Sequence, residues 1–563
     1  MRDPAIASEP NKLKCTRHDR LKIIQHNKLK DRKREKPKTR SAKAHETMAT
    51  PPQKLAASLD ALKTLQERGV VAVRARDLNR AHRELLEKSG FLQEVMKGWY
   101  IPSPPGGPAG DSTTWYTCFW PFAAGYLQAR FAREWSLSPE QSLSLHVGNQ
   151  TVPRQLVVRS PKARNRATPL PHDTSVLDIR AALPGDQDVE LKDALRLFSL
   201  PSALIASSPA FFRHNPTDAR AALANIRNAS EVLAKLLEGG HSTVAGRLAG
   251  GFRNIGRNRI ADDILSAMRA AGYAVREQDP FKTTIDIDLP AREVSPYANR
   301  IRLMWQAMRD PIVDRFPAPP GRPNDLDAYM KRVQENYVTD AYHSLSIEGY
   351  RVSPELIELV RSGSWNPDLE EKDREHRDAL AAHGYWLAFQ AVQRSIRRVL
   401  QGENPGLVAD EDHGGWYREM FSPSVTAGLL RAADLAGYRN GQVYIRRSMH
   451  VPLPRQAVID AMPVFFEMLA QETEASVRAV LGHFVFVYIH PYMDGNGRMG
   501  RFLMNAMLAA GGYPWTVVPV QQRASYMDAL EQASVAQNIV PFADFLAKLV
   551  EEGQRGTPVA TVP

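Results

Sequence analysis

Apolar residues recur at helical spacing along several separate stretches of the chain, and short alternating runs lie between these stretches. In residues 55–65 the apolar positions fall on one side of a helix, which predicts an amphipathic helix. Shorter helical stretches follow near residues 75–78 and 81–88, and residues 91–102 predict a β-hairpin closed by Lys97 and Gly98. Three helices followed by a hairpin favour a winged helix over residues 51–103.

The segment that follows predicts a boundary and then a mixed block. Residues 103–110, Ser-Pro-Pro-Gly-Gly-Pro-Ala-Gly, cannot continue a helix or a strand, so a linker or surface loop is expected there. Residues 111–290 combine helical stretches such as 219–237 with β-rich runs such as 155–159. This pattern predicts an α+β block.

The C-terminal half is predominantly helical in its pattern. A linker is expected over residues 291–325, which contain the proline-rich run 317–323, and a helical domain is expected over 326–553. Residues 554–563 are expected to be a disordered tail. A chain of 563 residues is too long for one core, so a multidomain protein is predicted.

Composition narrows the class of protein. The chain is 43% hydrophobic and 24% charged, which is typical of a globular protein. Cys15 and Cys118 are its two cysteines, so we expect no disulfide framework and a cytoplasmic location. The longest apolar run, 479–489, is interrupted by His483 and is too short to span a bilayer, and no secretory signal is visible, so no membrane partner is expected.

Positive charge is concentrated at the start of the chain. The net charge is +11, and residues 1–48 hold 15 Lys and Arg against 6 Asp and Glu, so the remainder is nearly neutral. The basic segment 1–50 lacks an apolar pattern that could build a core, which predicts a disordered tail. Two alternatives stay open: an arm that neutralises phosphates, or sequence upstream of a true start at Met48.

The clearest chemistry follows the apolar run. Residues 490–501 are His-Pro-Tyr-Met-Asp-Gly-Asn-Gly-Arg-Met-Gly-Arg, and the amphipathic stretch 502–510 comes next, which predicts a helix, a loop and a second helix. Gly495 and Gly497 allow consecutive N–H groups to converge at the start of the second helix, where the helix dipole favours an anion. This pattern predicts a phosphate site.

Charged side chains complete this predicted site. Arg498 and Arg501 are three residues apart on one helix face and can hold phosphate oxygens. Asp494 is suited to a Mg²⁺ ion that bridges phosphates, and His490 is the nearby side chain that can accept a proton near neutral pH. A helix connection of no function, or a structural metal bound by His490 and Asp494, is the alternative.

Residues 490–501 resemble the signature of the Fic (filamentation induced by cAMP) family, His-Pro-Phe-x-Asp/Glu-Gly-Asn-Gly-Arg-x-x-Arg, with Tyr492 in place of Phe. The resemblance implies an all-α Fic domain that transfers AMP from ATP to a Tyr, Thr or Ser hydroxyl of a target protein and releases pyrophosphate. It implies that His490 deprotonates the hydroxyl and that Asp494 binds Mg²⁺. The remaining roles are phosphate contacts, assigned to Gly495, Asn496, Gly497, Arg498 and Arg501.

A second segment is similar to the inhibitory motif of this family. Ser344-Leu-Ser-Ile-Glu348-Gly349 matches Ser/Thr-x-x-x-Glu-Gly/Asn. The resemblance implies that Glu348 pairs with Arg501 and blocks placement of the γ-phosphate, so that the domain is autoinhibited. A carboxylate that occupies an arginine excludes a phosphate by competition and repulsion. A solvated glutamate at a helix end is the alternative.

Two further regions resemble parts of the family. Residues 437–452, with Asn440-Gly441 as a turn, resemble the β-hairpin flap that aligns the target, with Tyr444, Ile445 and Arg446 along the target strand. Tyr526 resembles a residue that lines the adenine, although a core position is an equal alternative.

The N-terminal half resembles the abortive-infection antitoxin group of winged-helix regulators, whose wing strand carries a motif like Gly98-Trp99-Tyr100. This resemblance implies DNA binding as a toxin–antitoxin regulator, with four basic residues facing DNA: Arg76, Arg80, Arg83 and Lys97. A solvated helix face and a protein-binding adaptor are the alternatives.

Other functions stay open at this point. Proteins with this inhibited layout can remove AMP, with Glu348 activating a water. A regulator whose Fic domain is silent is a non-enzymatic alternative, and the intact His490 argues against it. The sequence does not name the target, exclude another nucleotide donor, or decide whether the chain forms a homo-oligomer.

Overall fold

The computed structural model describes residues 50–106, 110–283, 295–363, 365, 373–557 and 560–562. The predicted basic tail 1–50 therefore lies outside the described residues, except for Thr50. No helix in these ranges combines the length and the apolar character that crossing a bilayer requires.

The first described segment pairs two helices with a small sheet. Its strands lie in the order β1-β3-β2, and Gly98, with φ 80°, closes the predicted hairpin, which is confirmed. The helix expected at 75–78 is wrong: Arg74 donates its backbone N–H and its guanidinium to Asp77, and this pairing forms a turn. The winged-helix assignment stays a prediction. The elements are α1 (Pro51–Glu67), β1 (Val73–Arg74), α2 (Arg80–Lys88), β2 (Leu92–Met96) and β3 (Trp99–Pro102).

The next segment is the α+β block that the sequence predicted. A four-stranded sheet has the order β4-β5-β7-β6, with β5 and β7 parallel and the other pairs antiparallel. The strands are β4 (Ser136–Leu137), β5 (Gln155–Ser160), β6 (Arg166–Leu170), β7 (Thr174–Arg180), β8 (Val189–Lys192) and β9 (Leu195–Phe198). The helices are α3 (Thr113–Phe131), α4 (Pro139–His146), α5 (Leu200–Ala206), α6 (Pro209–His214), α7 (Pro216–Ala224), α8 (Ser230–Glu238), α9 (Ser242–Asn254) and α10 (Asn258–Ala270).

The predicted linker 291–325 is wrong over most of its described length, because it contains the buried helix α11 (Pro296–Val313). Pro296 occupies the first turn, where its missing N–H costs no helical hydrogen bond. Arg300 is buried, forms an ion pair with Asp218 and donates from Nε to the Tyr488 hydroxyl at 3.1 Å. The helix is thus anchored by packing and by paired charge.

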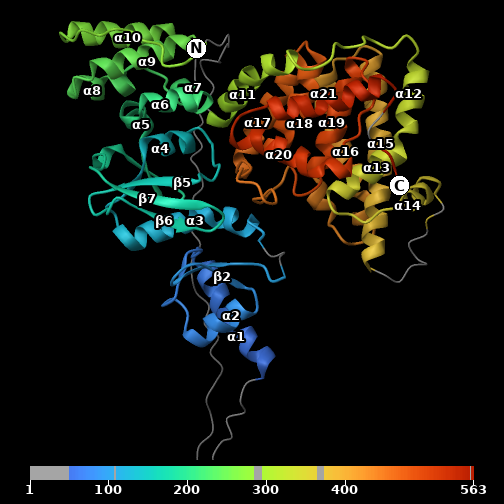
Figure 1. Cartoon of the computed structure of the whole chain (residues 1–563), viewed down its shortest axis with the longest axis horizontal. Helices are drawn as coiled ribbons and strands as arrows, with labels where there is room; N and C mark the ends of the chain where they lie inside the picture. Colours follow the sequence, from blue (N-terminus) through green and yellow to red (C-terminus); the bar gives the residue numbers. More distant parts are fainter. Residues whose placement is uncertain are drawn as a thin grey trace, which may run out of the picture. The chain divides into compact units, whose positions relative to one another are not determined.

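The remaining residues form the helical bundle coloured yellow to red in Figure 1. Its helices are α12 (Leu326–Glu335), α13 (Tyr337–Ile347), α14 (Pro354–Arg361), α15 (Asp373–Leu400), α16 (Pro405–Thr426), α17 (Arg455–Gln471), α18 (Ala475–Ile489), α19 (Asn496–Ala510), α20 (Arg523–Val535) and α21 (Val540–Gln554). In α18, every residue except Arg478 and Val487 is buried, so apolar neighbours surround this helix on all sides. The helix ends one residue before His490 and therefore fixes where that residue lies.

Two sequence predictions fail within this half. The β-hairpin flap is wrong as a structure: residues 437–452, all of them described, form no strand. Side chains take the backbone groups that a hairpin needs, since Glu531 accepts from the Met449 N–H and Arg439 donates to the Gly441 carbonyl. The disordered tail 554–563 is wrong in its described last part, because Ala560 is buried and the ring of His343 hydrogen-bonds the Thr561 carbonyl.

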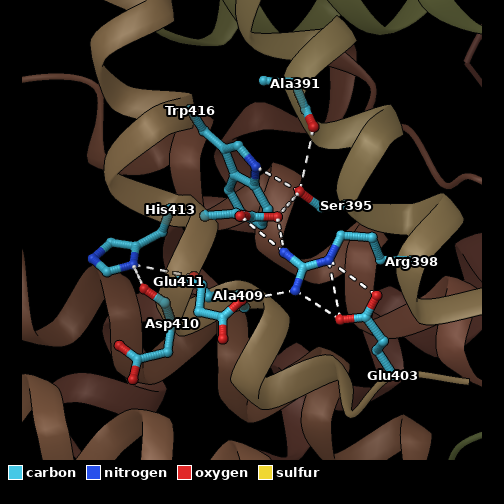
Figure 2. Close-up of polar contacts among 10 residues, drawn as sticks. Ala391, Ser395, Arg398, Glu403, Ala409, Asp410, Glu411, His413 and Trp416 are labelled. Carbon is cyan, nitrogen blue, oxygen red and sulfur yellow. Dashed lines mark hydrogen bonds and ion pairs between the residues drawn. The ribbon is translucent and has the colours of Figure 1, made fainter.

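A polar network joins α15 to α16 (Figure 2). The Trp416 indole N–H donates to Ser395 Oγ at 3.0 Å, and that hydroxyl donates to Asp412 at 2.6 Å. Arg398 closes the network with hydrogen bonds to Glu403 and Glu411 (Figure 2). It also donates to Asp412 at 3.1 Å. The indole N–H of buried Trp416 thus depends on the Ser395 hydroxyl for its hydrogen bond.

Changing Ser395 to alanine is expected to lower the free energy of unfolding by about 1–3 kcal/mol, because the buried Trp416 N–H loses its acceptor. Denaturant unfolding followed by tryptophan fluorescence measures this change. Thr426→Ala is the matched control, since that hydroxyl donates to the Ser422 carbonyl of α16 at an exposed position, and a change within about 0.5 kcal/mol is expected. Equal effects of the two changes would contradict the role of Ser395.

Candidate active site

The candidate site is the turn between α18 and α19. His490 caps the C-terminus of α18 in the left-handed region, with φ 56° and ψ 61°, and Gly495, with φ 76°, precedes the first residue of α19. The left-handed backbone at Gly495 costs little because glycine has no Cβ, whereas His490 must be held there by its surroundings. The turn brings the imidazole to the N-terminus of α19.

The hydrogen bond of His490 fixes which ring nitrogen is free. Nδ1 lies 3.1 Å from the Val487 carbonyl, which can only accept, so Nδ1 carries the proton and Nε2 carries the lone pair. Burial lowers the pKa of His490 to about 4, and the positive charge of Arg439 acts in the same direction. The imidazole is therefore a neutral base at neutral pH.

The N-terminus of α19 forms the anion cradle that the sequence predicted. Arg498 and Arg501 are both buried, so two positive charges lie next to the positive end of the helix dipole. Asp494 accepts from the Gly495 N–H at 2.7 Å, and its side chain is mostly exposed. Such a concentration of buried positive charge requires an anionic partner.

Glu348 is that partner in this structure. Its Oε2 accepts from Arg498 Nε at 2.8 Å, and its Oε1 accepts from Arg501 Nη2 at 2.9 Å. Arg501 also donates from Nε to Ser344 Oγ at 2.8 Å. Burial alone would raise the pKa of Glu348, but the charges of the two arginines outweigh burial, so the pKa lies below its usual value. The sequence predicted a contact with Arg501 alone; the shared helix face of the two arginines was the signal for the second contact.

Gly497 gives Glu348 the room that this bridge needs. A Cβ atom at position 497 would lie 2.7 Å from Glu348 Oε1 and 3.2 Å from an Arg501 nitrogen, which is too close for the present arrangement. The backbone of Gly497 thus lies directly against the carboxylate, so any group that replaces the carboxylate contacts this backbone.

The side chain of Asn496 holds the turn together, and its predicted phosphate contact stays a prediction. Its Oδ1 accepts from the Tyr492 N–H at 2.9 Å and its Nδ2 donates to the Tyr492 carbonyl at 2.8 Å. Tyr492 in turn stacks on Tyr417, with ring centroids 3.7 Å apart. Asn496 therefore shapes the turn with its side chain and leaves only its backbone for an anion.

Changing Asn496 to alanine is expected to raise the hydrogen-exchange rate of the Tyr492 amide by at least about tenfold, because two backbone groups lose their partner inside the turn. Mass spectrometry of peptic fragments that cover residues 486–500 measures this rate. The matched control is Asn538→Ala, where an exposed amide oxygen caps Val540, and no change in the 486–500 fragments is expected there. Unchanged exchange in the Asn496 variant would contradict this assignment.

Other predicted residues lie outside the turn itself, and one of them, Tyr526, interacts with Arg501. Tyr526 is buried, with its hydroxyl 2.7 Å from His483 Nε2, so it occupies the core position that the sequence left open, and a contact with adenine stays a prediction. Tyr444 is 38% exposed and Ile445 and Arg446 follow it on the irregular segment 437–452. Their target contact also stays a prediction.

The four predicted basic residues lie on α2 and in the turns next to β1 and β3, far along the chain from this turn. Arg76, Arg80 and Lys97 are exposed, and Arg80 pairs with Glu84. Arg83 donates to the Ala75 carbonyl at 2.8 Å, so its guanidinium serves the fold of its own segment. DNA binding by these residues stays a prediction.

The candidate site offers a metal ion the carboxylate of Asp494. Among the residues that the structure describes, no group of three or more His, Cys, Asp and Glu side chains is arranged to hold a metal. Asp494 is exposed at the edge of the cradle with Oδ2 3.5 Å from Arg498. One exposed carboxylate beside a phosphate site fits Mg²⁺, which takes the remainder of its ligands from water and substrate phosphates.

Part of the C-terminal half of the chain matches a known protein family. Residues 412–508 match the model of the Fic/DOC family. The chain is 30% identical over 229 residues to "Protein adenylyltransferase Fic" of Drosophila virilis and 28% identical over 227 residues to that of Nematostella vectensis. These alignments cover 40% and 39% of this chain and 43% and 49% of the relatives, so the chain spans less than half of their length.

Solved structures of Fic proteins are similar to part of the chain. Fic-1 from C. elegans is 18% identical, with a TM-score of 0.35, over 60% of this chain and 96% of that protein. A Fic family protein from Desulfovibrio desulfuricans G20 is 18% identical, with a TM-score of 0.32, over 48% of this chain and 77% of that protein.

Proposed function

We propose that the Fic domain in the C-terminal half of this chain transfers AMP from ATP to a hydroxyl group of a target protein, and that Glu348 restrains the transfer. One observation carries the proposal: the neutral base His490 lies next to a helix N-terminus whose two buried arginines are bridged by a carboxylate. The adenylyltransferase name of the similar proteins supports the choice of nucleotide.

The chemistry follows from the groups at the turn. Nε2 of His490 accepts the proton of the target hydroxyl, whose oxygen forms a bond to the α-phosphorus of ATP. The bond between the α-phosphorus and the bridging oxygen breaks, and pyrophosphate leaves. The N-terminus of α19, Arg498 and Arg501 stabilise the charge of the phosphates. Asp494 would hold a Mg²⁺ ion, which would supply further positive charge there. The residues thus supply position and charge, and the nucleophile comes from the target.

The restraint follows from competition for the arginines. Glu348 occupies one nitrogen of each guanidinium group, and the γ-phosphate of ATP needs the same donors. A phosphate placed beside the carboxylate would also meet a like charge in a buried site. ATP therefore binds in a competent position only when Glu348 moves away.

The target is proposed to approach along residues 444–446. Tyr444 is half-exposed and Arg446 lies at the surface of the same irregular segment. This segment continues to Leu453. Arg439 donates hydrogen bonds to the Leu453 carbonyl and to the His490 carbonyl, and so connects the segment with the turn that carries His490. A hydroxyl side chain held there would enter close to the base.

The test uses the full-length Glu348→Gly protein with Mg²⁺ and ATP that carries the label at either the α- or the γ-phosphate. We expect label on protein from the α-position only, and a mass increase equal to AMP. Label from the γ-position would indicate phosphorylation. No label from ATP or other nucleotides, with folded protein, would overturn the proposal, and release of AMP from modified protein by the wild type would favour the reverse reaction.

A further inference from the structure

A buried arginine outside the signature holds the backbone of the turn. The Arg439 guanidinium donates from Nε to the His490 carbonyl at 2.7 Å and from Nη1 to the Gly441 carbonyl at 2.9 Å. Its Nη2 donates to the Leu453 carbonyl, and its backbone N–H donates to the Pro491 carbonyl at 2.9 Å. One side chain thus connects the end of α18 with both ends of the segment 439–453.

This arginine is held in the interior by carbonyl groups. Arg439 is 3% exposed, and no carboxylate in the described part of the chain forms an ion pair with it. Burial lowers its pKa to about 10, so the side chain keeps its charge at neutral pH. The carbonyls of Ile489 and His490 lie at the C-terminal end of α18, where the helix dipole favours a cation. The charge is therefore stabilised by the same residues whose position it fixes.

His490 needs such support because of its backbone. A left-handed conformation is unfavourable at a residue with a Cβ, so His490 keeps this backbone only because its surroundings hold it there. The hydrogen bond from Arg439 fixes the direction of the His490 carbonyl, and the bond from Nδ1 to Val487 fixes the ring. Together these two bonds determine where Nε2 points.

We propose that Arg439 is a positioning residue for His490, which orients the base by holding the His490 carbonyl and the backbone on either side of the turn. This inference rests on the proposed function. The charged groups that face His490 are Arg439 from segment 439–453, Glu348 at the end of α13 and Asp494 in the turn. Arg439 disfavours the protonated imidazole and the two carboxylates favour it.

The test compares full-length Arg439→Gln and Arg439→Lys in the Glu348→Gly background. Arg478→Gln is the matched control, because Arg478 is also partly buried in α18, donates to the Glu472 carbonyl, and lies at the opposite end of the helix from His490. The measurements are kcat, the affinity for ATP, and the pKa of His490 by NMR of ¹³C-labelled histidine, assigned by its loss in His490→Ala.

We expect Arg439→Gln to lower kcat by about 10²-fold, because a displaced base is no longer aligned, while ATP affinity stays within about threefold. The pKa of His490 rises in this variant because the positive charge is lost. Arg439→Lys keeps the pKa and lowers kcat by about tenfold, since lysine keeps the charge and loses the planar fork. Arg478→Gln is expected to change neither kcat nor the pKa of His490.

Three outcomes would overturn the role of Arg439: an unchanged kcat in Arg439→Gln, a pKa of His490 that rises equally in the glutamine and lysine variants, or the same losses in Arg478→Gln. If Arg439→Gln does not fold, kcat and the pKa of His490 in Arg439→Lys still test the role of Arg439. If the Glu348→Gly parent transfers no AMP, the proposed function alone is overturned. The role of Arg439 is still tested in that case, because the pKa of His490 is measured without any turnover.

Discussion

Changing His490 to alanine is expected to lower the rate of AMP transfer by about 10³-fold in the Glu348→Gly background, which is the usual contribution of a positioned general base. The initial rate of transfer from α-labelled ATP measures this loss. ATP affinity is expected to stay within about threefold, since the phosphates bind at α19 and its arginines.

The pH dependence adds an independent check on His490. The folded pKa of about 4 lies below the usual value, so the neutral base is present above that pH and is lost as the pH falls through about 4. The transfer rate of the parent protein is therefore expected to show no loss from His490 protonation between about pH 8 and pH 6. His214→Ala, which changes an exposed histidine, serves as the control and should retain full activity. A His490→Ala protein that kept more than about a tenth of the rate would contradict its role as base.

Changing Glu348 is expected to raise the rate of AMP transfer in the order Gly above Gln above wild type, by about 10- to 100-fold for Gly. The glycine variant frees Arg498 and Arg501 for phosphate, whereas glutamine removes the charge and keeps the volume. Initial rates at fixed ATP, together with ATP affinity from calorimetry, measure the effect. Glu358→Gln is the matched control, because that glutamate pairs with Arg361 at an exposed position of α14.

A second measurement on Glu348→Gly separates release of a restraint from an unspecific effect. Removal of this carboxylate leaves two buried arginines without their anion, so the free energy of unfolding is expected to fall by about 3–5 kcal/mol. Saturating Mg²⁺ and ATP should recover a larger part of this loss in the variant than in the wild type, because phosphate then replaces the carboxylate. A variant with unchanged stability, or one that ATP stabilises no more than the wild type, would contradict the shared arginine site.

The residues of the turn could be predicted because their chemistry is contiguous in the chain. His490, Asp494 and the two arginines fall within one short segment, and Ser344 and Glu348 form a second one. Spacing alone placed the arginines on one helix face. The double contact of Glu348 required the structure, because it depends on where α13 ends relative to α19.

The failed predictions have separate physical causes, each of which lies in contacts that spacing and composition do not show. Asn440-Gly441 with alternating apolar residues is typical of a hairpin, but Arg439 and Glu531 take the backbone groups of this segment. The linker prediction rested on the proline-rich run 317–323, which is irregular, but it also included the preceding residues that form the buried helix α11. Arg439 itself was missed because its main contact, the His490 carbonyl, is 51 residues away.

The burial of α18 on all sides has a consequence for how this chain can vary. An amphipathic helix has a neutral face on which substitutions accumulate, and the spacing of tolerated positions then follows the helical period. α18 has no such face, because apart from Arg478 and Val487 each of its residues is enclosed. A deep mutational scan should therefore show near-uniform intolerance from Ala475 to Ile489, and divergence among descendants of this sequence is expected to accumulate elsewhere.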